Sequence, residues 1–147
     1  MSKVNLAVHY FRTSPQSTKA KGEALLSIKL ADYLRKMTLS GKCKATWTKI
    51  AHETFDKPKI IRSKSGKISK ISLSGNLLRN MGKLAGVADF IFTWDNHLLW
   101  LELKVAKGKQ SEDQLFFQKW CESTGSPYEV AYSFKDAVEI LTKYGVV

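Results

Sequence analysis

The chain has 147 residues, with 24 Lys or Arg against 13 Asp or Glu, so its formal net charge is +11. A hydrophobic fraction of 44% is ordinary for a globular protein and excludes a disordered polyelectrolyte, and this length fits one domain over residues 1–147. A small domain this basic usually meets a polyanion. Nucleic acid is the first candidate, an anionic membrane surface the second, and a basic protein with neither partner the third.

The cysteines and the N-terminal segment bear on where the protein works. Cys43 and Cys121 lie far apart and form no CxxC pair, which favours a reducing compartment and argues against a zinc site. The apolar run near the N-terminus is too short for a signal peptide, and no segment approaches the length of a membrane span. We therefore expect a cytoplasmic protein, in the host cytoplasm if a phage encodes it.

The first third of the chain predicts a helix between two strands. Residues 1–12 alternate in polarity and predict a short strand, and residues 44–52 predict another. A helix is expected from Ser17 or Thr18 to about Lys36, because leucines recur there at helical spacing. The apolar stripe of that helix consists of Leu26, Leu30 and Leu34.

The stretch 57–70 has a composition of its own, with six basic residues, no acidic one, a proline and a glycine. We expect an exposed loop or flexible hairpin that binds nucleic-acid phosphates. Its candidate phosphate-binding residues are Lys57, Lys59, Arg62, Lys64, Lys67 and Lys70. A short helix or turn is expected next, punctuated by Gly82 and Gly86.

The second half of the chain predicts a hairpin followed by helix, strand and helix. Asp95 and Asn96, a pair typical of two-residue hairpin turns, separate strands at 89–94 and 97–105. The later elements are expected at 111–124 (helix), 128–132 (strand) and 133–144 (helix). This order predicts an α/β fold in which helices flank a mixed central sheet.

The second hairpin strand places two charges on one face. Because strand side chains alternate, Glu102 and Lys104 point the same way while Leu103 between them takes the other face. Burying two charges in so apolar a strand is costly unless they are paired or bound to a metal. In a hairpin that turns at 95–96, Asp89 lies opposite Glu102, so two carboxylates can converge on one cation.

Two carboxylates and a lysine are the groups that metal-dependent phosphodiester hydrolysis uses. Mg²⁺ is commonly held by one or two carboxylates together with substrate phosphate, and an ammonium stabilises the charge that grows on the phosphate. Asp89 and Glu102 are thus candidate metal ligands and catalytic residues, and Lys104 is the candidate catalytic cation. The alternative is an ordinary ion pair between Glu102 and Lys104 on an edge strand.

A series of motifs follows in a fixed order: Gly-x-x-Asp, a hydrophobic hairpin, Glu-x-Lys, a Gly-Lys loop, a Ser-x-x-Gln helix start and a strand–helix ending. They are Gly86–Asp89, Glu102–Lys104, Gly108–Lys109, Ser111–Gln114 and Val130–Leu141. Over roughly residues 82–141 the chain resembles a virus-type replication–repair nuclease (VRR-NUC) domain, a family of the PD-(D/E)xK nuclease superfamily. Ala88 stands where that family usually has proline, which we expect to alter only the local turn.

The resemblance implies a restriction-endonuclease-like core and a DNA endonuclease that depends on Mg²⁺ or Mn²⁺. It also implies Glu23 on the first helix and the backbone carbonyl of Leu103 as further metal ligands, and Gln114 as a catalytic residue. Two alternatives stay open. Glu23 could instead form an i,i+4 salt bridge with Lys19, and Gln114 could close a capping box with Ser111.

The expected substrate is DNA, favoured in branched, flapped or four-way form, cut by a homodimer in replication, recombination or repair. Residues flanking the expected site add candidate phosphate contacts, with a plain solvated charge as the alternative for each: Arg79, Lys83, Lys107 and Lys109. The four tryptophans are expected in the core rather than as base-stacking platforms. The alternative functions are a catalytically inactive DNA-binding protein of the same fold and an RNA-binding accessory protein.

Overall fold

The computed structural model describes residues 20–50, 59–71 and 73–147. The strand expected at 1–12 and the candidate Lys57 lie outside the described residues. The helices and strands in chain order are α2 (Gly22–Leu39), β1 (Thr46–Lys49), β2 (Lys59–Arg62), β3 (Ile68–Ile71), α3 (Leu73–Asn80), β4 (Phe90–Trp94), β5 (His97–Leu103), α4 (Glu112–Ser123), β6 (Tyr128–Ala131) and α5 (Phe134–Lys143).

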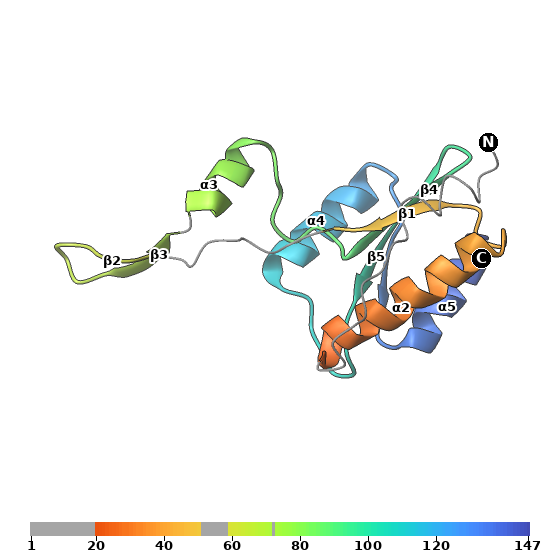
Figure 1. Ribbon diagram of the computed structural model, residues 1–147. Coiled ribbons are helices and arrows are strands. Elements are labelled where there is room, and N and C mark those ends of the chain that lie inside the picture. The colour runs from red at the N-terminus through yellow and green to blue at the C-terminus, as the bar shows by residue number, and fades with distance from the viewer. Residues whose placement is uncertain (1–19, 51–58, 72) are drawn as a thin grey trace.

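A four-stranded mixed sheet forms the centre of the molecule, in the order β1-β4-β5-β6. β1 and β5 each pair antiparallel with β4, whereas β6 pairs parallel with β5. Figure 1 shows the sheet with α2 and α5 on one side and α4 on the other. The predicted α/β architecture with a mixed central sheet flanked by helices is therefore confirmed.

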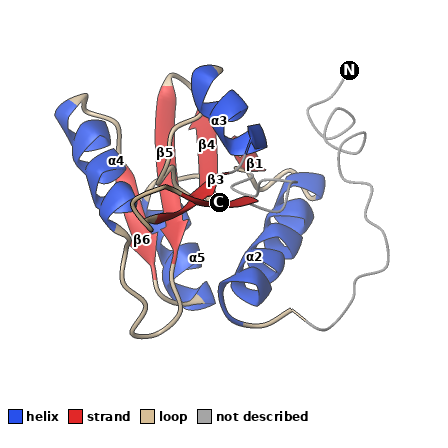
Figure 2. Ribbon diagram, turned by 90° about the vertical axis from the view of Figure 1, so that its left-hand side faces the viewer, coloured by secondary structure: helices blue, strands red, loops and turns tan. Residues whose placement is uncertain are grey.

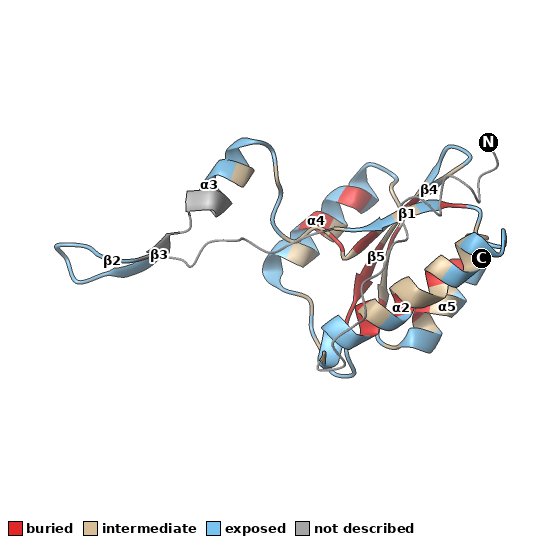
Figure 3. Ribbon diagram, viewed as in Figure 1, coloured by how far each residue is buried: buried red, intermediate tan, exposed pale blue. Residues whose placement is uncertain are grey.

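Helices cover both faces of the sheet (Figure 2), and each face packs against them through its own cluster of apolar side chains. The larger layer joins α2 and α5 to the sheet through Leu30, Leu34 and Leu141, all fully buried, and the predicted leucine stripe of the first helix faces it. The smaller layer joins α4 to the opposite face, with Phe117 and Cys121 packed near Tyr128. Buried residues therefore lie on the sheet and on the helices packed against it, whereas the described side chains of residues 60–80 are exposed or half-buried (Figure 3).

The hairpin between β4 and β5 turns at the predicted residues. Trp94 pairs with His97, and Asp95 and Asn96 between them have φ values of 40° and 65°. Positive φ at both central positions matches the twist of the flanking strands, and Asp and Asn tolerate it better than most residues. This turn fixes the register in which residue 89 faces residue 102.

The first helix is the clearest correction to the predicted boundaries. Residues 20 and 21 are not helical, α2 begins at Gly22, and it ends at Leu39 rather than at Lys36. Gly22, the first residue of α2, has a φ of 58°, outside the right-handed helical range, so α2 does not continue back through it. The predicted start at residue 17 or 18 lies outside the described residues. β1 is likewise shorter than the predicted strand at 44–52, whose last two residues lie outside the described ranges.

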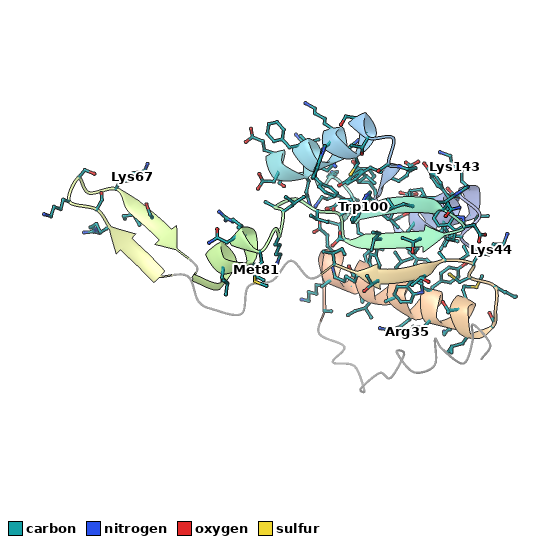
Figure 4. The ribbon with its side chains drawn as sticks, turned by 90° about the horizontal axis from the view of Figure 1, so that it is seen from above. Arg35, Lys44, Lys67, Met81, Trp100 and Lys143 are labelled. Carbon is teal, nitrogen blue, oxygen red and sulfur yellow. The ribbon has the colours of Figure 1, made fainter. Side chains whose placement is uncertain are left out.

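The basic segment folds as a hairpin, one of the two forms predicted for it. β2 pairs antiparallel with β3, from Lys59 opposite Ile71 to Arg62 opposite Ile68. The hairpin and α3 form an arm that extends from the central sheet, with Lys67 near its end and Met81 closer to the sheet (Figure 4). Among the described residues, no helix is both long and apolar enough to cross a membrane.

Candidate active site

Asp89 and Glu102 face each other across the β4–β5 hairpin. Phe90 pairs with Leu101, so the next position along places residue 89 opposite residue 102. Asp89 Oδ2 accepts a hydrogen bond of 2.9 Å from the backbone N–H of Leu103, which holds the carboxylate against β5. The predicted register of Asp89 and Glu102 is therefore observed, while their convergence on one cation stays a prediction.

Glu102 is almost wholly buried, with 1% of its surface exposed. Its Oε1 accepts hydrogen bonds from Lys104 Nζ at 2.9 Å and from Gln114 Nε2. Its Oε2 is buried and has no hydrogen-bond partner among the described residues. Burial, and then the negative charge of Asp89, raise the pKa of Glu102 above the ordinary 4.5, although the hydrogen bond from Lys104 opposes this.

Lys104 lies at the centre of the acidic residues. Its ammonium is 2.9 Å from Glu102 and 3.6 Å from Glu23, and its side chain is only 8% exposed. Burial lowers its pKa, but the hydrogen bond to Glu102 and the nearby carboxylates outweigh it, so the pKa rises above 10.5 and the lysine stays charged. The edge-strand position of the alternative is wrong, because β5 lies between β4 and β6 and the pair is buried, while a purely structural role for the pair stays the alternative to a catalytic one.

Gln114 closes the predicted capping box and also contacts Glu102, while its catalytic role stays a prediction. Its Oε1 accepts from the backbone N–H of Ser111 at 2.8 Å, and its own N–H donates to Ser111 Oγ at 3.3 Å, which is a capping box. Its Nε2 donates to Glu102. One half of the amide therefore caps α4 and the other half reaches the buried carboxylate.

Two further metal ligands were expected, the Glu23 carboxylate and the Leu103 carbonyl, and neither is shown beside the Glu102 carboxylate by a direct contact. Glu23 is at the start of α2 and is paired with Lys104 at 3.6 Å, while Lys19, its predicted alternative partner, lies outside the described residues. Leu103 contacts Asp89 through its N–H, and a contribution from its carbonyl stays a prediction. The described part of the chain contains no group of three or more His, Cys, Asp or Glu side chains arranged to hold a metal.

The candidate phosphate-binding residues are spread over the arm and the rim of the site. Arg62, Lys64 and Lys67 are exposed on the hairpin, and Arg79 is exposed at the end of α3. Lys107 and Lys109 are exposed in the loop after β5, while Lys83, in the segment before β4, is half-buried. None of these forms an ion pair with another described residue.

Sequence reasoning missed two groups beside the site. Lys49 Nζ lies 3.0 Å from Asp89 Oδ1, a contact made possible because β1 pairs with β4 forty residues further along the chain. Tyr128 is buried on the same side of the sheet and accepts from Gln110 at 3.4 Å through its hydroxyl. Burial and the charge of Glu102 raise its pKa well above 10, so it stays a neutral phenol.

Gly86 explains how the segment before β4 can lie against α4. Its φ is 73°, and a Cβ there would overlap the peptide group between Asp113 and Gln114. Only glycine fits so close an approach at such a φ. This contact ties the segment leading to Asp89 to the helix end that carries Gln114.

Ala88, which stands where the resembled family usually has proline, is fully buried in the apolar layer under α4.

Comparisons of the chain with protein-family models, with curated proteins and with solved structures gave no match.

Proposed function

We propose that the protein is a DNA endonuclease dependent on Mg²⁺ or Mn²⁺, of the VRR-NUC kind and with a restriction-endonuclease-like core, that favours branched, flapped or four-way DNA. The net charge of +11 suits a polyanionic substrate. The arrangement of Asp89, Glu102 and Lys104 at one end of the β4–β5 hairpin supports hydrolysis rather than binding alone.

The observation that carries the proposal is the buried and unpartnered Oε2 of Glu102. Leaving a carboxylate oxygen buried without a partner costs free energy, and the facing carboxylate of Asp89 adds repulsion. A divalent cation held by both carboxylates would relieve both costs, and Mg²⁺ commonly takes one or two carboxylates from a protein. When bound, this cation would supply Lewis-acid polarisation of the phosphate.

The chain's own residues have distinct parts in the proposed reaction. The Lys104 ammonium, kept charged by its acidic neighbours, stabilises the negative charge that develops on the phosphate oxygens. Gln114 orients the Glu102 carboxylate by donating to Oε1, which leaves Oε2 for the cation. The N–H of Leu103 orients Asp89 in the same way. Glu102 and Leu103 lie on β5 and Gln114 lies on α4, while Asp89 and Lys104 directly flank β4 and β5. Strands and helices hold a site more tightly than loops do.

A catalytically inactive DNA-binding protein of the same fold is the second candidate. Buried charge is the observation against it, because Glu102 and Lys104 bring a desolvation cost that phosphate binding alone does not require.

The homodimer remains part of the proposal. Val146 is fully buried in the core and Val147 packs beside it, so these two residues supply local packing and not a dimer surface.

The test is cleavage of end-labelled linear, flapped and four-way DNA of matched sequence by the purified protein, with Mn²⁺ or with EDTA. We expect cutting only with the metal, faster on branched DNA, by a species whose light-scattering mass is twice the 16.6 kDa of one chain. Tight binding to all three DNAs without any cutting would favour the inactive DNA-binding protein. Equal cleavage rates on all three DNAs would contradict the proposed preference for branched DNA and leave the active-site assignment standing.

A further inference from the structure

The outer side of α4 exposes two aromatic side chains one helical turn apart. Phe116 is 62% exposed and Trp120 is 56% exposed. They border an open hollow of about 280 Å³, lined by Leu84, Ala85, Asp113, Phe116, Phe117 and Trp120. Trp120 rests against Phe117 at 6.3 Å between ring centres, which fixes it on one side. The prediction that the tryptophans belong to the core is therefore wrong for Trp120.

Both walls of this hollow lead directly into the candidate active site. Along one wall, Ala85 precedes Asp89 by four residues, so the two are at most about 14 Å apart even in an extended chain. Along the other wall, Asp113 precedes Gln114, which contacts Glu102. A DNA strand with one phosphate at the site could place a base in the hollow within about four stacked nucleotides.

Two lysines lie beside the hollow and can contact the phosphates of a nucleic-acid strand. Lys119 Nζ lies 6.0 Å from the centre of the Phe116 ring, and Lys83 precedes the wall formed by Leu84. Asp113 is the one acidic side chain lining the hollow, and its carboxylate can accept from the exocyclic amino group of a base.

We propose that Phe116 and Trp120 form a stacking subsite for unpaired nucleobases of the DNA strand that enters the candidate active site. Bases within a duplex are already stacked and paired, so only a single-stranded segment, as in a flap or a frayed end, can use these rings. The subsite thus gives the endonuclease a means of selecting its substrate. This inference rests on the proposed function for its biological meaning, but base stacking can be measured without cleavage.

The experiment compares binding of two fluorescent oligonucleotides in EDTA by anisotropy: a short single-stranded DNA, and one of equal length whose nucleotides lack bases. Phe116→Ala/Trp120→Ala should weaken binding of the normal oligonucleotide by roughly tenfold to a hundredfold. Binding of the abasic oligonucleotide should change little, because its phosphates are unaltered. Trp120→Phe should retain most of the affinity, since it keeps a ring at that position.

Leu115→Ala is the matched control, because Leu115 is 45% exposed on the same helix but has no ring. Unchanged affinity in the double variant, or equal loss on both oligonucleotides, would overturn the stacking subsite. So would a wild-type dimer that becomes a monomer in the double variant, which would make this surface an interface between copies. If base-dependent binding is lost as expected but wild type cuts no DNA, the proposed function fails and the subsite stands.

Discussion

Gln114 contacts the buried Glu102 through its amide nitrogen while its amide oxygen caps the helix on which it lies. The start of α4 and the buried carboxylate are therefore fixed by one side chain. Because the amide oxygen caps the helix and the amide nitrogen contacts Glu102, single substitutions can separate an effect on stability from an effect on cleavage.

Gln114→Glu should leave the helix stable but slow cleavage strongly. Glutamate also closes a capping box, so the acceptor for the Ser111 N–H is kept. The N–H donor to Glu102 is lost, and a negative charge is added beside a carboxylate whose pKa is already raised. Single-turnover cleavage and urea unfolding measure the two effects.

Ser111→Ala is the complementary change, because it removes the cap but keeps the donor to Glu102. It should lower the free energy of unfolding by about 1 kcal/mol and leave the cleavage rate near that of wild type. If Gln114→Glu instead keeps both its stability and its cleavage rate, Gln114 is a capping residue alone.

Lys104→Met should both abolish cleavage and destabilise the fold. Removing one partner of a buried ion pair leaves Glu102 uncompensated and costs about 3 to 5 kcal/mol. Glu102→Gln/Lys104→Met should be more stable than Lys104→Met, because the buried carboxylate is gone as well. Urea unfolding in EDTA measures this coupling.

Lys135→Met is the matched control for that series, since Lys135 pairs with Glu139 at 3.6 Å and both side chains are mostly exposed. It should change neither cleavage nor stability appreciably. An active Lys104→Met variant, measured where it is folded, would show that the buried pair serves structure only.

Stability in EDTA should fall, relative to Glu102→Gln, as the pH rises above 4.5 and through the raised folded pKa of Glu102. The raised pKa of Glu102 means that the folded protein holds this proton more tightly than the unfolded chain does. The corresponding stability is present at low pH and is lost as the pH rises through the folded pKa. Other carboxylates cancel in the comparison, because the variant shares them.

Saturating Mn²⁺ should remove that relative loss, since a cation stabilises the ionised carboxylate. The melting-temperature gain from Mn²⁺ should vanish at acidic pH, with a midpoint above 4.5. The same gain in Glu102→Gln as in wild type would place the metal elsewhere.

Neutralising the exposed basic residues of the hairpin should weaken DNA binding without regard to sequence. With Arg62, Lys64 and Lys67 changed to Gln, the slope of log K against log salt should become shallower by about one to three units. The control changes Lys36, Lys42 and Lys44, which are exposed at the end of α2 and the start of β1. Equal slopes for both triple variants would show that the hairpin has no special part in binding.

Local sequence patterns predicted the β4–β5 hairpin, the capping box of α4 and the start of α5 near residue 133, because neighbouring residues determine them. Asp95 and Asn96 tolerate positive φ, and Ser111 and Ser133 accept from backbone N–H groups as helix caps. The register that brings Asp89 opposite Glu102 follows from that turn alone.

Features that depend on distant pairings were not predictable in this way. The contact of Lys49 with Asp89 requires β1 to lie beside β4. Lys104 is buried because β6 and Gly108 cover the end of β5, which the Glu-x-Lys spacing does not reveal. The exposed rings did have a signal in the sequence. Phe116 and Trp120 are spaced i,i+4, and each lies next to a buried residue of the same spacing, Phe117 and Cys121. The helix α4 therefore carries more apolar residues than one buried face requires.

The most direct test of the proposed site is Mn²⁺-dependent cleavage of flapped DNA by Asp89→Asn and Glu102→Gln, with Asp95→Asn as control at the opposite end of the same strand. Asn at 89 can still accept from the Leu103 N–H, so the hairpin should be preserved. We predict that both site variants bind DNA as wild type does but cut it at least a hundredfold more slowly, roughly the effect of losing one transition-state contact, while Asp95→Asn cuts normally. Wild-type cleavage by either site variant would contradict the assignment.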